Sequence, residues 1–310
     1  MRSIEQTHLY SLNKYIDNFI YLHDHKRLPN KIMLSGNKGI GKSVLALHLI
    51  NYILSKNENY PYNKKEYVIN NLNRSFKLVN ENIHPNFFYV EIEDEKKNIS
   101  IDQVRNIISF CNKSSFNNSE RIVLINNIET LNKNSSNALL KVLEEPNEKV
   151  IFILIKDSSK ILINTIYSRC IKFNISIDEN QKNNILDNIL DENFINNLNN
   201  EFKNYFFSPG VYINLFNFYN ENSIKFEISI DELLELIMKK KLYKNNPFVK
   251  NNIGLFFELY FSKKFFSLKN NITVFNDYKK FIKEIHNTYK YNLDLESILL
   301  QYEKKLINEK

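Results

Sequence analysis

Gly36-Asn37-Lys38-Gly39-Ile40-Gly41-Lys42-Ser43 is the stretch that decides how this 310-residue chain folds. The spacing Gly-x-x-x-x-Gly-Lys-Ser is typical of a phosphate-binding loop between a strand and a helix. An apolar strand at residues 31–35 precedes the loop, and an apolar helix from Ser43 to about Ser55 follows it. Three of the five glycines in the chain lie in this loop, where they let successive backbone N–H groups turn toward phosphate oxygens. The stretch therefore predicts a nucleotide-binding domain of the α/β class.

The expected site is the loop itself. It consists of Gly36, Asn37, Lys38, Gly39, Ile40, Gly41, Lys42 and Ser43. Lys42 is expected to reach the β- and γ-phosphates, and Ser43 to offer its hydroxyl to Mg²⁺. The helix that starts near Lys42 adds the positive end of its dipole. ATP is the expected ligand and Mg²⁺ would enter only with it, while the sequence leaves open whether the loop is occupied.

The strand expected at residues 121–125 lacks the acid that hydrolysis requires. An ATPase of this class holds Mg²⁺ with an Asp at the end of a neighbouring strand and usually orients water with a Glu. Here the strand ends in Asn126-Asn127, whose neutral amides cannot act as a base. Glu129 is a candidate substitute, although its spacing does not fit the usual role. Since a lost general base costs typically ~10²–10⁴-fold in rate, we expect negligible hydrolysis by the isolated chain.

Composition sets the broad class. Hydrophobic residues make up 43% of the chain, enough for two or three domains. The net charge of +7 is compatible with a nucleic-acid partner without requiring one. Cys111 and Cys170 predict neither a disulfide framework nor a zinc site, which favours a reducing cytoplasm. Apolar runs are of strand length and the first residues lack a signal-peptide core, so we expect a cytoplasmic protein without a membrane partner.

Strand and helix patterns alternate up to about residue 175. Strands are expected at 31–35, 87–90, 121–125, 150–155 and 170–175, and helices from 101 and from about 134 until Pro146. Such alternation predicts a parallel sheet with helices on both faces. Beyond residue 175 helical periodicity dominates, so we expect three domains, 1–175, 176–220 and 221–310.

The last of these domains carries two apolar helical stripes and much of the positive charge. The stripes are Ile230, Leu233, Leu234, Ile237 and Met238, and Tyr278, Phe281, Ile282 and Ile285. Residues 222–310 hold 16 Lys against 11 Asp or Glu. Lys239-Lys240-Lys241 and Lys263-Lys264 could face DNA, although a solvated helix face is the favoured interpretation.

Four segments follow the loop in a characteristic order. They are His84-Pro85-Asn86, Ile101-Asp102-Gln103-Val104-Arg105, Asn137-Ala138-Leu139-Leu140-Lys141-Val142-Leu143-Glu144-Glu145-Pro146 and Thr165-Ile166-Tyr167-Ser168-Arg169-Cys170. In these segments the chain resembles bacterial clamp-loader subunits of DNA polymerase III, which are AAA+ proteins. The resemblance covers roughly residues 8–175 and is only architectural beyond them.

The resemblance implies a RecA-like domain, a small helical lid and a helical C-terminal collar, in agreement with the three expected domains. It implies gamma/tau and delta subunits as partners, together with the sliding clamp and primer-template DNA. The ATP-hydrolysing gamma/tau type keeps Asp-Glu on its acid strand and usually carries a four-cysteine zinc module. This chain has Asn126-Asn127 and no cysteine between Ser43 and His84, which favours the delta-prime type, although delta-prime members vary in the zinc module.

Three alternatives stay open. The first is an active ATPase subunit of the gamma/tau type, in which Glu129 or another acid replaces the missing pair. The second is a stand-alone P-loop phosphotransferase, which the Leu-Glu-Glu-Pro and Ser-Arg-Cys segments disfavour. The third is a nucleotide-independent DNA-binding module that uses the basic C-terminal segment.

In the resembled family, the Arg of the segment Ser168-Arg169-Cys170 is a finger inserted into the ATP site of the adjacent subunit. Arg169 is therefore the expected catalytic residue, acting in trans. The alternative is an arginine that binds carbonyl groups at a helix end before the next strand. Cys170 is expected to be a packed structural residue.

Three further positions bear on the site. Val211-Tyr212 follow Ser208-Pro209-Gly210, where ATPases of the family place a sensor arginine. Lys156 stands where a small polar sensor is usual; it could bind phosphate, but a solvated strand end is the favoured interpretation. His84 has no cysteine or second histidine near it in the sequence, so a structural role before Pro85 is expected.

Overall fold

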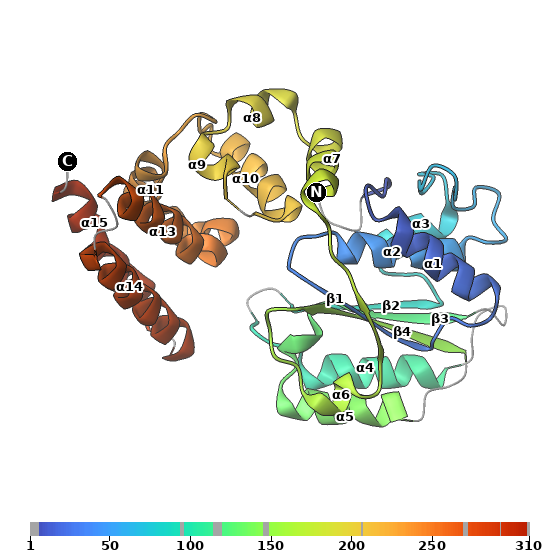
Figure 1. Ribbon diagram of the computed structural model, residues 1–310. Helices are drawn as coiled ribbons and strands as arrows, with labels where there is room; N and C mark the ends of the chain where they lie inside the picture. The colour runs from blue at the N-terminus through green and yellow to red at the C-terminus, as the bar shows by residue number, and fades with distance from the viewer. Residues whose placement is uncertain are drawn as a thin grey trace. The chain divides into compact units, whose positions relative to one another are not determined.

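The computed structural model describes residues 6–93, 96–113, 120–144, 149–205, 207–268, 272–291 and 293–308. The chain forms two compact units, residues 1–188 with 208–210, and residues 189–207 with 211–310. The first unit is α/β and the second is helical (Figure 1). The predicted class, a parallel sheet with helices followed by a helical region, is confirmed. The division into three domains stays a prediction.

A parallel five-stranded sheet forms the centre of the first unit, in the order β2-β3-β4-β1-β5. The strands are β1 (Lys31–Gly36), β2 (Phe87–Val90), β3 (Arg121–Ile125), β4 (Val150–Asp157) and β5 (Ile171–Asn174). All five strands expected from the sequence are confirmed. Strand β4 runs further than expected, through Lys156 to Asp157, because it stays paired with β1 to the end of that strand.

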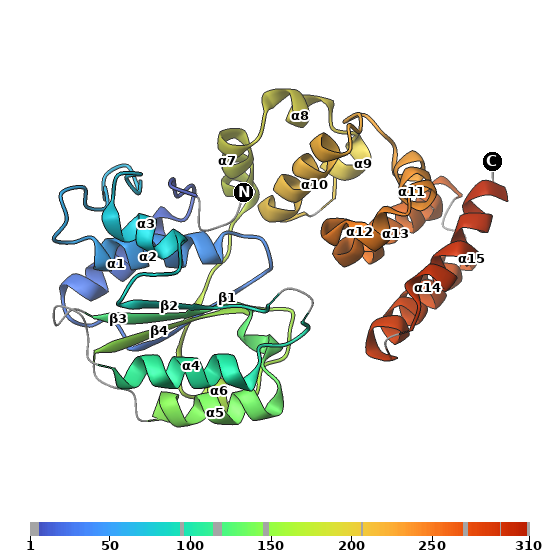
Figure 2. The same cartoon turned by 180° about the vertical axis from the view of Figure 1, so that it is seen from behind.

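Helices cover both faces of the sheet, as Figures 1 and 2 show from opposite sides. One face carries α1 (Asn13–Asp24), α2 (Lys42–Leu54) and α3 (Arg74–Asn80), and the other carries α4 (Ile101–Asn112), α5 (Lys133–Glu144) and α6 (Asn164–Tyr167). Along β4, Ile151 and Ile153 join the core beside α1 and α2, whereas Phe152 and Leu154 join the core beside α4 and α5. Burial on both faces explains why this strand is a continuous apolar run. The expected helix stop at Pro146 lies outside the described residues.

The second unit consists of short helices followed by longer ones. After α7 (Glu179–Ile189) come α8 (Glu192–Asn197), α9 (Asn200–Lys203), α10 (Pro209–Glu221), α11 (Ile230–Lys239), α12 (Leu242–Asn245), α13 (Pro247–Ser267), α14 (Ile272–Tyr291) and α15 (Leu295–Asn308). No helix within the described ranges is long and apolar enough to cross a membrane.

Apolar stripes hold these helices together. All five residues of the expected α11 stripe are buried, and a capping box of Ser229 and Glu232 begins this helix. Phe281 of α14 stacks on Phe257 of α13 with ring centroids 4.3 Å apart. The second stripe is only partly confirmed, because Ile282 is exposed. It follows Phe281 directly and therefore points about 100° around the helix from that buried ring.

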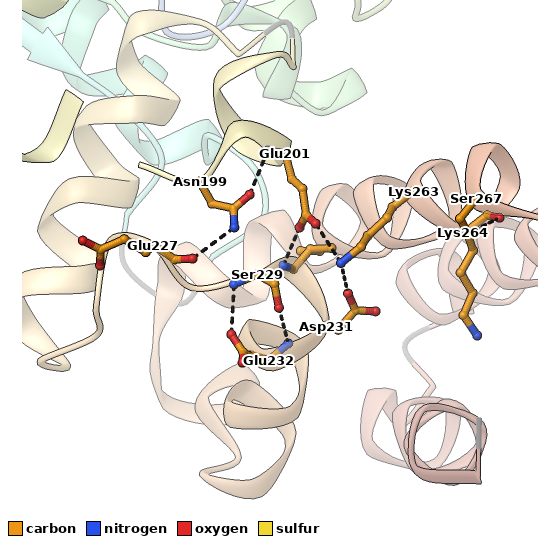
Figure 3. Close-up of polar contacts among 10 residues, drawn as sticks. Asn199, Glu201, Glu227, Ser229, Asp231, Glu232, Lys263, Lys264 and Ser267 are labelled. Atoms are coloured by element: carbon orange, nitrogen blue, oxygen red, sulfur yellow. Dashed lines mark hydrogen bonds and ion pairs between the residues drawn. The ribbon is translucent and has the colours of Figure 1, made fainter. Parts of the chain in front are cut away.

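A polar cluster joins α9, α11 and α13 within the second unit (Figure 3). The Lys263 ammonium lies 2.7 Å from a carboxylate oxygen of Glu201 and also contacts the Asp231 carboxylate. The other Glu201 oxygen accepts a hydrogen bond from the backbone N–H of Ile230, the first residue of α11, at 2.8 Å. Glu201 thus stabilises a helix start and neutralises a lysine at the same time.

Replacement of Phe152 tests whether the sheet core governs the stability of the first unit. Phe152→Ala removes a fully buried ring and should lower the free energy of unfolding by about 3–5 kcal/mol. Ile161→Ala is the control, because Ile161 is 94% exposed; it should change that free energy by no more than about 0.5 kcal/mol. Urea unfolding followed by circular dichroism measures both. Equal effects would contradict the assignment of the core.

Candidate functional site

The loop between β1 and α2 has the backbone geometry that phosphate binding requires. Gly39 and Gly41 have φ of +84° and +92°, values that L-residues with side chains rarely adopt. Gly41 directly precedes the first turn of α2, so that the unpaired N–H groups of this helix start face the loop. The residues of the loop therefore fit a phosphate group.

Lys42 is held inside its own loop. Its ammonium donates hydrogen bonds to the carbonyl oxygens of Gly36 at 2.8 Å and Asn37 at 2.6 Å, and its side chain is buried. Burial lowers the pKa of Lys42 to about 8, while the carboxylates of Asp157 and Glu129 act in the opposite direction. A bound triphosphate would have to offer this ammonium oxygen atoms in place of the two carbonyls.

Two asparagines follow β3, and the structure gives a side-chain partner to the first of them. The Asn126 side chain donates to the Tyr89 hydroxyl at 3.4 Å. Asn127 has a φ of +53°, and its carbonyl oxygen accepts hydrogen bonds from the backbone N–H and the hydroxyl of Thr130. Glu129 lies in a single 3₁₀ turn, Ile128–Thr130, and its carboxylate accepts the backbone N–H of Asp157 at 3.3 Å.

Asp157 is a site residue that sequence reasoning missed. It pairs in register with Gly36 of β1, so its carboxylate acts on the Lys42 ammonium. One of its oxygens also accepts the backbone N–H and the hydroxyl of Ser159. The carboxyl ends of neighbouring parallel strands meet at one edge of a sheet. An acid directly after the apolar run of β4 could therefore have been placed beside the phosphate loop from the sequence.

Lys156 is buried, so the expectation of a solvated strand end is wrong. Its ammonium donates to the carbonyl oxygens of Asp157 at 2.7 Å and Lys160 at 2.6 Å. The last residue of β4 and the turn after it supply these acceptors, which compensate for the burial of the charge.

The segment Ser208-Pro209-Gly210 lies against the phosphate loop inside the first unit. The backbone N–H of Gly210 donates to the carbonyl oxygen of Gly39 at 2.9 Å. A Cβ atom added to Gly210 would come within 2.8 Å of the Gly39 Cα. In the second unit, Tyr212 is buried and its hydroxyl donates to the Phe202 carbonyl at 3.0 Å, so it packs in the helical core.

Arg169 lies at the end of α6, where its guanidinium has two partners. Nη1 donates to the Thr165 carbonyl oxygen at 2.8 Å, and Nη2 donates to a Glu144 carboxylate oxygen at 2.6 Å. About a third of the side chain is exposed. The carbonyl contact is the one that the structural alternative predicted; the finger stays a prediction.

Neither cysteine has the character of a nucleophile. Burial raises the pKa of both the Cys111 and the Cys170 thiol to about 11, so that both are protonated near neutral pH. The packed role expected for Cys170 is confirmed by its contact with the core beside α4 and α5.

His84 has a structural role, as predicted. Its Nδ1 accepts the backbone N–H of Asn86 at 3.1 Å, and its Nε2 lies 3.2 Å from the Ser75 hydroxyl. Burial lowers the pKa of His84. The neutral imidazole therefore stabilises the turn before β2.

The basic C-terminal residues are partly neutralised. Lys241 lies 3.0 Å from a Glu296 carboxylate oxygen, and Lys263 belongs to the polar cluster of Figure 3. Charges that already have carboxylate partners release fewer counterions when they meet a phosphate backbone. These contacts do not favour a dedicated DNA-binding surface at Lys241 and Lys263.

A cavity of about 580 Å³ lies at the amino ends of β2 and β3, beside Phe87, Phe110 and Arg121. Arg121 is buried, stacks on the Phe110 ring and donates to the carbonyl oxygens of Cys111 and Lys113. It therefore caps the end of α4. The phosphate loop lies at the carboxyl ends of the strands, so this cavity does not belong to the same site.

Comparison with known proteins identifies the family. The family model described as "DNA polymerase III, delta subunit" matches residues 12–179. The chain belongs to this family, which confirms the resemblance seen in the sequence. Subunit delta' of DNA polymerase III from Pseudomonas aeruginosa is 33% identical over 140 residues, which are 45% of this chain and 41% of that protein. Subunit delta' from Buchnera aphidicola subsp. Baizongia pistaciae is 31% identical over 161 residues, 50% of this chain and 46% of that protein.

A relative of the other type is also similar. Subunit gamma of DNA polymerase III from Buchnera aphidicola subsp. Acyrthosiphon pisum is 28% identical over 156 residues, 50% of this chain and 41% of that protein. The chain spans about half the length of the curated relatives it matches.

Alanine at Gly39 tests the loop geometry. Gly39→Ala forces a side chain into a positive φ and places its Cβ 2.3 Å from the Ser208 hydroxyl oxygen, so we expect a loss of stability of about 1–2 kcal/mol or more. The matched control is Gly254→Ala in α13, where a Cβ meets nothing within 4 Å; it should stabilise the chain by about 0.5–1 kcal/mol. Thermal unfolding measures both, and the same sign for both variants would contradict this geometry.

The burial of Lys42 predicts a pH dependence. Folding lowers the pKa of this lysine from 10.5 to about 8, so between these values the unfolded chain binds more protons and stability rises with pH. The free energy of unfolding, taken relative to Lys42→Met, should rise by roughly 2–3 kcal/mol across that window. Denaturant titrations of both proteins at several pH values measure the difference. A flat difference would show that Lys42 keeps an ordinary pKa.

Proposed function

We propose that this chain is a delta-prime-type, non-hydrolysing subunit of a bacterial DNA polymerase III clamp loader. One observation supports this above all others. The loop at Gly36–Ser43 keeps its phosphate-binding geometry, while β3 ends in Asn126-Asn127. A site of this kind can hold a triphosphate but lacks the carboxylates that activate water and bind Mg²⁺ beside it.

ATP is the proposed ligand of the loop. Backbone N–H groups at the start of α2 would contact the phosphates, Lys42 would turn from its carbonyl partners toward them, and Ser43 would bind the Mg²⁺ that enters with the nucleotide. Glu129 is a weak replacement for the missing acid, because its carboxylate already accepts the Asp157 N–H. The active-ATPase alternative is therefore less well supported.

Arg169 is the proposed contribution to a neighbouring subunit. Its guanidinium is always charged and can stabilise the charge that develops on a transferred phosphoryl group. Exposed apolar side chains flank it in residues 161–171, namely Ile161, Ile163, Tyr167 and Ile171. A partner that covers these side chains would also remove water from around Arg169.

The proposed assembly contains gamma/tau and delta subunits, opens the sliding clamp and loads it onto primer-template DNA. This role would place the chain in the cytoplasm. The alternative of a stand-alone phosphotransferase can be tested by gel filtration with the candidate subunits. Such an enzyme would elute alone, whereas a clamp-loader subunit would elute with them.

Arg169→Ala tests the trans role in the reconstituted complex. The variant should assemble normally. The neighbouring site that Arg169 faces should stop contributing to the DNA-stimulated ATPase rate, because arginine fingers increase that rate by ~10³–10⁵. Arg105→Ala is the control, since Arg105 is also in an exposed ion pair, with Asp102. Steady-state phosphate release measures both.

An unchanged rate for Arg169→Ala would remove the finger role. Rapid ATP turnover by the isolated chain would contradict the proposal of a non-hydrolysing subunit.

A further inference from the structure

Two segments that are far apart in the sequence meet through one ion pair. Glu144 is the last residue of α5, and Arg169 follows α6. Their side chains meet with Nη2 of Arg169 2.6 Å from Oε1 of Glu144. Glu144 does not contribute to the phosphate loop. Its ion pair with Arg169 offers a reason for a carboxylate at this position.

The position of Glu144 is unfavourable for the helix that carries it. A carboxylate in the last turn of a helix lies beside unpaired carbonyl groups and the negative end of the helix dipole. Half of the Glu144 side chain is exposed, so packing in the core does not explain its placement either. The Lys31 ammonium donates to the Leu143 carbonyl oxygen at this end of α5, at 2.7 Å. The Arg169 guanidinium compensates the Glu144 charge and also binds the Thr165 carbonyl of α6.

The two contacts orient the guanidinium without using it up. An arginine side chain has five N–H donors in one plane. Among the described residues, the Thr165 carbonyl and the Glu144 carboxylate engage one donor on each terminal nitrogen, which fixes that plane at two points. No described residue accepts from the remaining donors, and the exposed third of the side chain can be reached by phosphate oxygens.

We infer that Glu144 is a positioning residue for Arg169, holding the guanidinium in the orientation in which it enters a neighbour's nucleotide site. This inference rests on the proposed trans role of Arg169. An ion pair this exposed adds little stability, too little to withhold the arginine from a triphosphate. Its effect is to restrict a long side chain that would otherwise sample many rotamers.

Reconstituted complexes with substitutions at Glu144 test the inference. The measured quantity is the part of the DNA-stimulated kcat that Arg169→Ala removes. Glu144→Ala should lose most of that part, about tenfold, with KM for ATP unchanged, since a misplaced catalytic group costs rate and not binding. Glu144→Gln should keep it within about threefold, because the amide oxygen accepts the same N–H. The double variant Glu144→Ala/Arg169→Ala should equal Arg169→Ala alone.

Glu179→Ala is the matched control, because Glu179 is also an exposed acid in an ion pair, with Lys182. If Glu144→Ala does not assemble, Glu144→Asp decides, since it keeps the charge but shortens the reach by one methylene; a wild-type rate would then overturn the inference.

The outcomes distinguish failure of the trans role of Arg169 from failure of the positioning role of Glu144. If Arg169→Ala has no effect, the trans role fails and the inference fails with it. If Arg169→Ala lowers the rate but Glu144→Ala matches the wild type, only the positioning role is overturned. A faster rate for Glu144→Ala would also overturn it, because Glu144 would then restrain Arg169.

Discussion

The burial of one ammonium group is the constraint on which the site depends. Lys42 lies inside the loop without a direct carboxylate partner among the described residues, so backbone carbonyls must surround its charge. Only a loop whose peptides turn sharply can aim the Gly36 and Asn37 carbonyls at the same nitrogen, and the positive φ values of Gly39 and Gly41 allow that turn. The sheet supplies the rest, because β1 ends beside β4 and brings Asp157 to the same edge.

In the proposed function, holding a phosphate is separate from cleaving it. Glu129 and Asp157 are near enough to act on Lys42. Yet the Glu129 carboxylate accepts the N–H of Asp157, the last residue of β4, and the Asp157 carboxylate accepts the N–H of Ser159 in the turn after it. Both carboxylates are therefore already engaged with the backbone. In the proposed function, the group that acts on a nucleotide is Arg169, which follows α6.

The sequence predicted the elements better than the polar contacts. Strands β1, β3 and β4 are apolar runs bounded by polar residues, so their buried positions follow from composition alone. The last residues of β4 were missed because Lys156 and Asp157 are charged. The burial of Lys156 depends on the carbonyls of Asp157 and Lys160. The pair Glu144–Arg169 could not be predicted either, since it requires the packing of α5 against α6. The exposure of Ile282 shows that an apolar stripe predicts which face of a helix is buried but not how wide the buried surface is.

The contact between Gly39 and Gly210 is made by backbone alone. The Gly39 carbonyl oxygen accepts the N–H of Gly210, the second residue of α10. A ligand that rotated the Gly39 peptide would therefore move this acceptor directly, without a side chain between them. Such a mechanical link survives the drift of surrounding side chains in an Asn- and Lys-rich sequence. A Cβ at either glycine would disturb it, since it would lie 2.3 Å from the Ser208 hydroxyl oxygen or 2.8 Å from the Gly39 Cα.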